Sequence, residues 1–438
     1  MAASRKTTKV IVVGGGGTMG SSTALHLVRS GYLPSNITVL DAYPIPSPQS
    51  AGHDLNKIMS VRLRNSPDLQ LSLEALDMWK NDQLFKPFFH NVGMIDCSSS
   101  AAGIAALREK YNSLTAAGVG LEKTNTWLET EGEILLKLPC FTSQQVKGWK
   151  ALLTTDGGWL AAADAISAIG HFLTSQGVRF CFGSSGTFKC PLFTAADKST
   201  CTGVETADGA KHYAEKVILA AGAWTPTLID LEGQCVAKAW VLAHIQLTPS
   251  EALRYKNIPV VYDGEYGFFF EPTADGIIKV CDEFPGFSHF KKRQPYGARQ
   301  PTLVSMPRSR VDHPTDTYPD SSERSIRSAI ARFLPELKDK PLVHRAMCWC
   351  ADTADANLLI CEHPMWKNFI IATGDSGHSF KLLPNIGKHI VELMEGTLKA
   401  DLEEAWKWRP GGDALKSRRA APARDLAGVA GWKHDAGF

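Results

Sequence analysis

The sequence predicts an α/β fold made of two interleaved domains, and three observations lead to this expectation. First, a β-branched run at residues 9–13 is followed by a glycine cluster and a helical pattern. Second, the pattern becomes that of antiparallel strands between residues 238 and 278. Third, an apolar run at residues 368–373 again opens into a glycine turn and a helix. The chain of 438 residues is also longer than one core usually supports.

The N-terminal segment KVIVVGGGGTMG predicts a site for a dinucleotide. Gly15, Gly17 and Gly20 fit the spacing G-x-G-x-x-G. In that motif the glycines permit a tight turn, a close approach of the backbone to a pyrophosphate and close packing of a helix on a strand. The helix, expected at residues 21–30, would direct its N-terminal N–H groups at the pyrophosphate.

The second predicted strand, residues 37–40, ends at Asp41, which lies 21 residues after Gly20 (41 − 20). A carboxylate at about this spacing reaches a ribose 2′-hydroxyl and would repel the 2′-phosphate of NADP. A glycine-rich surface turn is the alternative interpretation, but the order of strand, glycines, helix, strand and acidic residue argues against it. From the residues alone, the dinucleotide is either FAD or NAD.

Composition argues against several classes of protein. Apolar residues make up 44% and charged residues 21% of the chain, and the formal net charge of +2 gives no reason to expect nucleic acid as a partner. No apolar run approaches the roughly 20 residues that cross a bilayer. The histidines show no spacing such as H-E-x-x-H, so no metal is expected. Ten cysteines without a C-x-x-C pair favour a reduced, cytoplasmic protein, and the last residues differ from the Ser-Lys-Leu type of peroxisomal signal.

The remaining elements follow from periodicity and turn residues. Loop 50–64 carries polar and charged residues, which would lie over a cofactor or form a solvated turn. An apolar strand at 216–221 runs into small residues, which would let the backbone approach the cofactor or form a simple turn. A hairpin is expected around 272–275, and long loops at 284–321. Helices are expected at residues 68–79, 102–117, 159–177, 324–333 and 383–396.

Four stretches together resemble the fructosyl amino acid and fructosyl peptide oxidases (amadoriases), relatives of monomeric sarcosine oxidase. The stretches are VVGGGGTMGSSTALHL, SAGHDLNKIMSVRLR, GFFFEPTADGIIKVCDEFPGF, and MCWCADTADANLLICEHP with ATGDSGHSFKLLP. The resemblance covers residues 9 to about 433 and is closest to the fungal fructosyl peptide oxidases. It implies a Rossmann-like FAD-binding domain, discontinuous in sequence, and a substrate domain on a mixed sheet. The implied FAD-binding segments are 1–90, 150–233 and 342–400, and the substrate segments are 91–149, 234–341 and 401–438.

The resemblance also implies that FAD is bound covalently, through a thioether from the flavin 8α-methyl group to a cysteine. In the sarcosine oxidase pattern an aspartate follows the linked cysteine by seven residues. Cys348 lies seven residues before Asp355 (355 − 348), and Cys350 lies five before it (355 − 350). Cys348 is therefore the expected attachment residue and Cys350 the alternative. From the residues alone, a buried unreactive thiol would be the simpler interpretation.

Four residues are expected to be catalytic because of the resemblance. Lys279 would lie beneath the flavin and present positive charge where dioxygen is reduced; the alternative is a lysine at a strand edge with its charge in solvent. Asn56 and Lys57 match the loop over the other face of the flavin, where sarcosine oxidase has arginine. Lys381 matches a lysine that binds the substrate carboxylate in sarcosine oxidase. In this chain, Lys381 would meet the sugar or amine region, because the expected substrate is longer.

The resemblance assigns further residues to the substrate and the cofactor. Arg409 would bind a carboxylate with Glu283 beside it, and Arg62 lies where the family varies between preferences for α- and ε-glycated substrates; solvated charge is the alternative for both arginines. The expected substrate-binding residues are Arg62, Tyr266, Glu283, His378, Lys381 and Arg409. The expected cofactor-binding residues are Gly15, Gly17, Thr18, Met19, Gly20, Asp41, Ser50, Lys57, Ala221, Gly222, Cys348, Asp375, Gly377 and Lys381.

The activity that the resemblance implies is oxidation of an Amadori compound, a fructosyl amino acid or dipeptide. Hydride would pass from sugar carbon 1 to the flavin, the imine would hydrolyse to glucosone and an amino acid or peptide, and dioxygen would become hydrogen peroxide. One alternative is an oxidase of other secondary amines, such as sarcosine or pipecolate. Another is an NAD-dependent dehydrogenase, against which the cysteine region argues. The expected partners are the small-molecule substrate and dioxygen, with no nucleic acid or membrane, and the expected state is a monomer.

Overall fold

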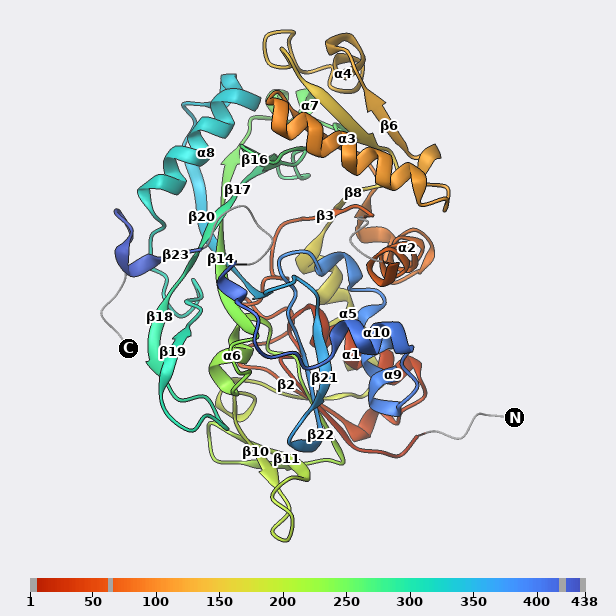
Figure 1. The fold of residues 1–438 in the computed structure, drawn as a ribbon, viewed down its shortest axis with the longest axis vertical. Coiled ribbons are helices and arrows are strands. Elements are labelled where there is room, and N and C mark those ends of the chain that lie inside the picture. Colours follow the sequence, from red (N-terminus) through yellow and green to blue (C-terminus); the bar gives the residue numbers. More distant parts are fainter. Residues whose placement is uncertain (1–5, 62–65, 417–422, 434–438) are drawn as a thin grey trace.

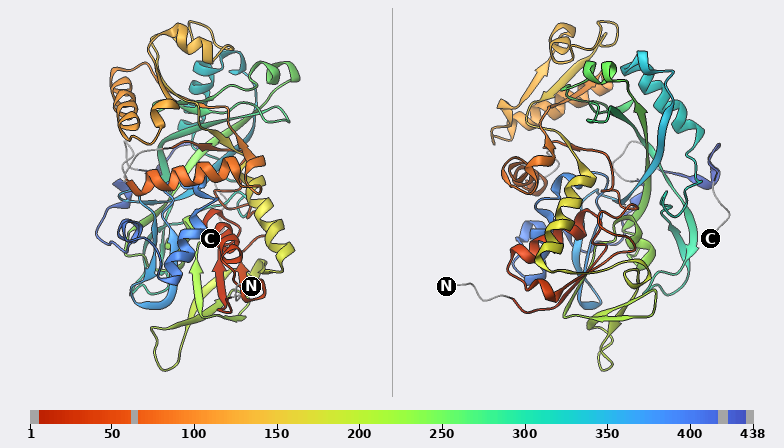
Figure 2. Two further views of the ribbon diagram at one scale, coloured as in Figure 1. Left: turned by 90° about the vertical axis from the view of Figure 1, so that its right-hand side faces the viewer. Right: turned by 180° about the vertical axis from the view of Figure 1, so that it is seen from behind.

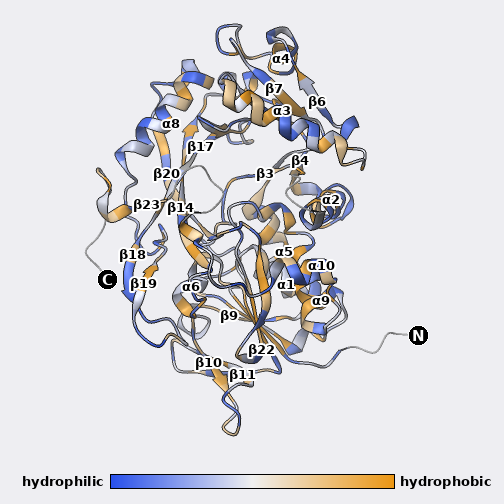
Figure 3. Ribbon diagram, in the orientation of Figure 1, coloured by the Kyte–Doolittle hydropathy of each residue, from blue (hydrophilic) through white to orange (hydrophobic). Residues whose placement is uncertain are grey.

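The computed structural model describes residues 6–61, 66–416 and 423–433. Two large sheets organise the chain: a six-stranded sheet beside helices α1, α5, α9 and α10, and a nine-stranded sheet of long strands (Figures 1 and 2). Apolar residues gather on the strands of both sheets and on the helices that cover them (Figure 3). The predicted α/β class with a second, mixed-sheet part is confirmed.

The six-stranded sheet contains the predicted nucleotide-binding strands. Its order is β21 (Leu359–His363), β22 (Trp366–Thr373), β13 (Lys216–Leu219), β1 (Val10–Val13), β2 (Ile37–Leu40) and β9 (Arg179–Cys181). Neighbouring strands are parallel except β21 and β22. All four residues of β1 are buried, because its two faces pack into two different apolar clusters.

Two layers cover this sheet. Helix α1 (Thr18–Arg29) packs against α9 (Ile386–Glu395) and α5 (Ala162–Gln176) on one face. On the other face lies a small sheet of β10 (Phe188–Phe193), β11 (Cys201–Thr206) and β12 (Lys211–Tyr213). Since β22 pairs with β13 and α9 packs on α1, the predicted return of the C-terminal segment to this domain is confirmed. Helix α1 begins at Thr18, three residues earlier than predicted, so the last motif glycine lies within its first turn.

The nine-stranded sheet is built around three strands of 12 residues each, β14 (Cys235–Gln246), β17 (Ile277–Ser288) and β20 (Leu342–Thr353). β14 lies between the other two and is antiparallel to both. The sheet continues through β16 (Gly267–Phe269), β15 (Val260–Asp263), β5 (Met94–Ser98), β7 (Lys150–Thr154) and β6 (Asn125–Leu128), and β23 (Arg424–Asp425) pairs with β17. Helices α3 (Ala101–Ala116) and α8 (Asp320–Phe333) lie against this sheet (Figure 1).

The prediction of long loops at residues 284–321 was wrong in its first half. β17 continues to Ser288, and the next residues form a hairpin of β18 (Phe290–Arg293) and β19 (Thr302–Ser305). The extension of β17 pairs with β14, a partner distant in the chain, so the local sequence does not indicate it, whereas β18 and β19 pair with each other. β7 and β20 also pair in the nine-stranded sheet although they fall inside predicted FAD-binding segments, so the expected boundaries at 150 and 342 do not coincide with the edge of either sheet.

Smaller elements complete the chain. The strands β3 (Lys57–Met59), β8 (Gly158–Leu160) and β4 (Phe89–His90) form a three-stranded sheet that holds the end of loop 50–56. The other helices are α2 (Ser66–Asn81), α4 (Glu131–Lys137), α6 (Thr225–Leu228), α7 (Pro249–Arg254) and α10 (Ala400–Trp406). Within the described ranges, no helix has the length and apolar character that crossing a membrane requires.

Candidate active site

A cavity of about 510 Å³ lies between the two large sheets and is lined by residues of both. It begins at the carboxyl end of β1 and the start of α1, the position at which open parallel sheets bind their ligands. It ends against aromatic and charged side chains of β15, β16 and β17. Of the predicted cofactor-binding residues, those that line it are Gly17, Thr18, Met19, Asp41, Ser50, Lys57, Ala221, Gly222, Cys348, Asp375, Gly377 and Lys381.

The glycine turn has no space for larger residues. Gly14 adopts φ +80°, and a Cβ on it would lie 2.5 Å from the carbonyl oxygen of Ala220. A Cβ on Gly20 would lie 2.2 Å from the carbonyl oxygen of Gly14. Gly17 is the N-cap of α1 and lines the cavity. The turn therefore brings bare backbone and a helix N-terminus to the cavity, as a pyrophosphate requires, while Gly15 and Gly20 contribute by packing.

Asp41 lies at the end of β2, as predicted, and lines the cavity. Its carboxylate accepts hydrogen bonds from the backbone N–H groups of Gly16 (2.9 Å) and Tyr43 (3.0 Å). Burial raises the pKa of this carboxyl, although these hydrogen bonds oppose the effect. The position suits a ribose hydroxyl, and ribose binding by Asp41 stays a prediction.

A cluster of three charged side chains forms the inner wall. The ammonium group of Lys279, on β17, lies 2.6 Å from a carboxylate oxygen of Asp54 and donates to the carbonyl of Asn56 at 2.8 Å. Lys57 reaches the same carboxylate oxygen at 2.7 Å. Burial opposes the charge of Asp54, but the two ammonium groups outweigh it and hold its pKa well below the usual range. Burial likewise opposes the charge of Lys57, and Asp54 raises its pKa well above normal.

Asn56 lines the cavity with its side chain fully buried. Among the described residues, neither its amide nitrogen nor its amide oxygen has a hydrogen-bond partner. A buried polar group left without a partner costs about 1–3 kcal/mol. A bound group with both donors and acceptors, such as a flavin ring, would satisfy this amide, so the lining fits a flavin at the inner end as well as a pyrophosphate at the outer end.

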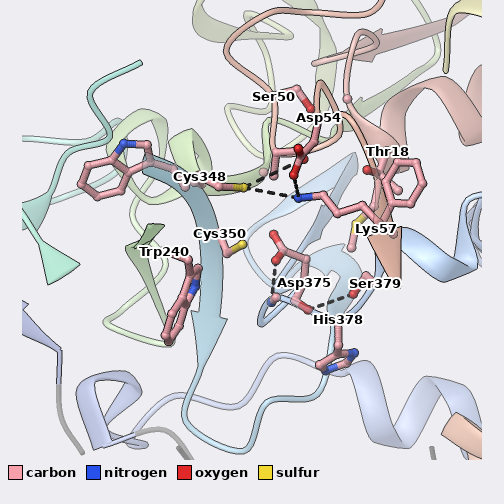
Figure 4. A pocket seen from close by; sticks show the side chains of 18 of the residues that line it. Thr18, Ser50, Asp54, Lys57, Trp240, Cys348, Cys350, Asp375, His378 and Ser379 are labelled. Atoms are coloured by element: carbon pink, nitrogen blue, oxygen red, sulfur yellow. Dashed lines mark hydrogen bonds and ion pairs between the residues drawn. The ribbon is translucent and has the colours of Figure 1, made fainter. Parts of the chain in front are cut away.

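Two thiols lie beside this cluster, both on β20 and both lining the cavity (Figure 4). The ammonium group of Lys57 lies 3.6 Å from the sulfur of Cys348. A hydrogen bond from Cys350 lowers the pKa of Cys348 below its ordinary value, with help from the charge of Lys57 and against the effect of burial. The pKa of Cys350 is raised, because its thiol donates that hydrogen bond and is buried. Cys348 is therefore the more nucleophilic of the two thiols.

The segment after β22 supplies the floor of the cavity. Asp375 accepts hydrogen bonds from the backbone N–H groups of Ala351 (3.1 Å) and Gly377 (2.8 Å), and burial raises its pKa. The ring of His378 contacts the carbonyl of Ala356 at 2.9 Å. Lys381 is 8% exposed and donates to the carbonyl of Ser60 at 3.4 Å. Ser379, which the sequence did not single out, also lines the cavity and donates to the carbonyl of Asp375 at 3.0 Å.

Other predicted substrate-binding residues are not brought to the cavity wall. Arg409 makes a two-pronged ion pair with Asp355, at 2.9 and 3.0 Å. Tyr266 packs edge-on against Phe333, 6.5 Å between ring centroids, and under the guanidinium of Arg332 at 4.4 Å. Neither lines the cavity as the described residues delimit it. Arg62 and the side chain of Glu283 lie outside the described residues.

Tyr262, Phe268 and Phe270 are among the aromatic residues that line the cavity. Phe268 stacks on Tyr262 (5.5 Å) and contacts Phe270 edge-on (5.6 Å). The alternation along β16 places Phe268 and Phe270 on the cavity face, whereas Tyr266, at the turn before the strand, packs toward α8. Period-2 counting forward from Phe268 would have identified Phe270, whereas counting back selects Tyr266, which the turn directs elsewhere.

Fold and site together define a dinucleotide-dependent oxidoreductase. Residues 9–393 match the model of the family described as FAD dependent oxidoreductase. The chain belongs to this family, and its cofactor is FAD. This result removes the NAD-dependent alternative.

Comparison with individual proteins shows which members of the family this chain resembles. A fructosyl peptide oxidase from E. terrenum is 73% identical, with a TM-score of 0.97 over 99% of this chain and 100% of that chain. A modified fructosyl peptide oxidase from Aspergillus nidulans, solved in complex with FSA, is 70% identical, with a TM-score of 0.97 over 98% and 100% of the two chains. The L-saccharopine oxidase of Schizosaccharomyces pombe is 31% identical over 92% of this chain and 93% of that protein. The predicted resemblance to fructosyl peptide oxidases is confirmed.

Proposed function

We propose that this chain is a FAD-dependent oxidase of Amadori compounds, acting on fructosyl amino acids and fructosyl dipeptides. The sugar C–N bond is oxidised to an imine, which hydrolyses to glucosone and a free amino acid or peptide, while dioxygen is reduced to hydrogen peroxide. The observation that carries the proposal is 73% identity, over 99% of the chain, to a fructosyl peptide oxidase.

The cavity residues have distinct parts in the proposal. Bound FAD supplies a hydride acceptor and passes two electrons to dioxygen. Lys279 holds a positive charge at a buried position, where it stabilises the negative charge that develops on dioxygen. The aromatic wall of Phe268 and Phe270 keeps that region apolar. Lys381 lines the cavity, and we assign its ammonium group to donate to the sugar or to the substrate nitrogen.

We assign recognition of the amino-acid end of the substrate to Arg409, Arg62 and Glu283. Arg409 would have to exchange Asp355 for a substrate carboxylate, because the ion pair occupies two of its N–H groups. Arg62 and Glu283 stay predicted contributors on the strength of the resemblance. A monomeric and cytoplasmic enzyme likewise stays a prediction.

We further propose that FAD is attached covalently to Cys348. The lowered pKa of this thiol and the ammonium group 3.6 Å from it favour the thiolate, which is the nucleophilic form. Forming the thioether removes the thiol hydrogen and one hydrogen of the 8α-methyl group, and the two electrons released leave with dioxygen as hydrogen peroxide. Cys350, whose pKa is raised, is the alternative site.

An anaerobic titration with fructosyl-valine, followed in the flavin absorbance band, tests the activity. Bleaching by the substrate, recovery in air and formation of hydrogen peroxide are the expected results. Fructosyl-lysine, added in a parallel titration, reports the preference between α- and ε-glycated substrates. Absence of bleaching with both compounds would overturn the proposal.

A second candidate is an oxidase of another secondary amine, such as sarcosine or pipecolate. The 31% identity to a protein named L-saccharopine oxidase is the observation that favours it. The same titration decides between the two: bleaching by sarcosine, pipecolate or saccharopine, with none by the fructosyl compounds, would establish the second candidate.

A further inference from the structure

A row of basic side chains crosses the nine-stranded sheet beside the cavity. His244, on β14, is opposite Lys279 on β17 and opposite His344 on β20. Residues directly opposite each other on antiparallel strands point to the same face of the sheet. His244 and His344 therefore share the face from which Lys279 reaches Asp54.

The row leads from the buried centre toward solvent. Lys279 is 2% exposed, the two histidines are half-buried, and Arg310, which contacts His344, is exposed. At the inner end, the ammonium group of Lys279 lies 2.6 Å from Asp54. The row therefore joins the charged cluster of the active site to the surface.

Contacts fix the two imidazole rings. Their centroids are 4.7 Å apart with planes inclined by 33°. The guanidinium of Arg310 donates to Nδ1 of His344, so that ring is neutral and carries its proton on Nε2. The Nε2 atom of His244 is buried and has no hydrogen-bond partner in the part of the chain that is described. His344 is thus held in one tautomer, whereas Nε2 of His244 is available for proton exchange.

The groups that face His244 keep it neutral near pH 7. Burial lowers the pKa of His244 to about 4, the positive charges of Lys279 and Arg310 and the neighbouring His344 add to this, and Asp54 opposes it. Burial and Arg310 also lower the pKa of His344. A neutral imidazole accepts a proton on one nitrogen and releases one from the other, so a proton can pass through it without a lasting charge.

We propose that His244 passes protons from solvent to Lys279 during reoxidation of the enzyme, and that His344 positions its ring. The inference rests on the proposed function, since only an oxidase returns electrons to dioxygen. Dioxygen takes two electrons and one proton from the reduced enzyme, and one further proton, to become hydrogen peroxide. Lys279 gives one proton to the reduced oxygen and regains it from His244, which regains it from solvent, so both residues end unchanged.

The experiment measures reoxidation of dithionite-reduced holoenzyme by air-saturated buffer in a stopped-flow instrument. His244→Asn should slow reoxidation at pH 7–8 by about 100-fold, the lower end of general acid–base contributions, and should enlarge the solvent deuterium effect. His344→Gln should give a smaller loss, and reduction by substrate should stay within about twofold in both variants. His363→Gln is the matched control, because burial lowers the pKa of His363 to about 4 as well, while it stacks on Trp366 at 3.7 Å away from the cavity wall.

The outcomes separate this inference from the proposed function. Dithionite reduces the enzyme whatever its organic substrate, so the substrate class does not enter the result. Reoxidation of His244→Asn at the wild-type rate, with the wild-type isotope effect, would overturn the role of His244 and leave the oxidase function standing. If air does not reoxidise the wild-type enzyme, the oxidase function itself fails, and this inference fails with it.

A second readout needs no turnover. In holoenzyme labelled with ring-¹⁵N histidine, Lys279→Met should raise the pKa of His244, because it removes a positive charge that faces the ring. The pKa of His363 should stay unchanged. An unchanged pKa of His244 would show that the two side chains are not coupled and would contradict the proposal.

Discussion

Replacing Lys279 by methionine removes one positive charge from the active site with little change of side-chain length. The charged cluster of Lys57, Lys279 and Asp54 carries one net positive charge, and the substitution reduces it to zero. In the proposed reaction, negative charge develops on dioxygen only during reoxidation of the enzyme. Lys279→Met should therefore slow reoxidation far more than it slows reduction by substrate.

The expected loss can be set from comparable sites. Removing one preorganised group that stabilises a developing anion costs about 3–4 kcal/mol, which corresponds to a rate loss of about 10²–10³-fold. Breaking a buried ion pair usually destabilises a protein by about 3–5 kcal/mol, because a buried charge is left unpaired. Asp54 keeps Lys57 as a partner at 2.7 Å, so the loss of folding stability should be smaller than that.

Stopped-flow measurement of the two half-reactions provides the test. Anaerobic mixing with fructosyl-valine gives the reduction rate, and mixing of reduced enzyme with dioxygen gives the reoxidation rate. The double variant Asp54→Asn/Lys279→Met separates charge from position, because Lys57 then restores one net positive charge. Partial recovery of reoxidation in the double variant is expected. Equal slowing of both half-reactions by Lys279→Met would refute the assigned role of its charge.

Three further predictions concern other parts of the chain. After denaturation in acid, the yellow colour should stay with the Cys350→Ser polypeptide and separate from the Cys348→Ser polypeptide. Flavin absorbance of the precipitated protein measures this. Loss of colour from Cys350→Ser alone would show that FAD is attached to Cys350 instead of Cys348. Gly20→Ala should lower Tm and weaken FAD binding, because its Cβ would lie 2.2 Å from a carbonyl oxygen, whereas Gly132→Ala, with no atom within 4 Å, should leave both intact or raise Tm. Burial lowers the pKa of His26 to about 4 from an ordinary 6.5, so folding stability should fall as the pH drops from 7 to 5, by about 2 kcal/mol from this group. Urea unfolding at both pH values should show a smaller decrease in His26→Gln, and an equal decrease would contradict the assignment.

Sequence reasoning succeeded where the relevant contacts are local. The turn from β1 into α1, with Asp41 at the end of β2, follows from glycine spacing and strand length, and the structure has all of it. It failed where position depends on distant partners. Residues 284–288 were expected in a loop, yet they extend β17 because β14 offers a pairing partner 48 residues earlier, Ala239 opposite Phe287 (287 − 239). Tyr266 was expected in the cavity, and the turn before β16 directs it toward α8 instead.

Asp54 shows why part of the site could not be predicted. It was visible in loop 50–64, but nothing nearby in the sequence distinguishes it from a solvated acidic residue, because its partner Lys279 lies 225 residues away. Once the two sheets pack together, this carboxylate is the shared partner of Lys57 and Lys279 and holds each ammonium group in place, one beside Cys348 and the other beside His244. Without Asp54, two buried ammonium groups would repel each other at the same wall. Asp54 thus allows two ammonium groups to lie at the wall of one cavity, and only the tertiary structure reveals this role of Asp54.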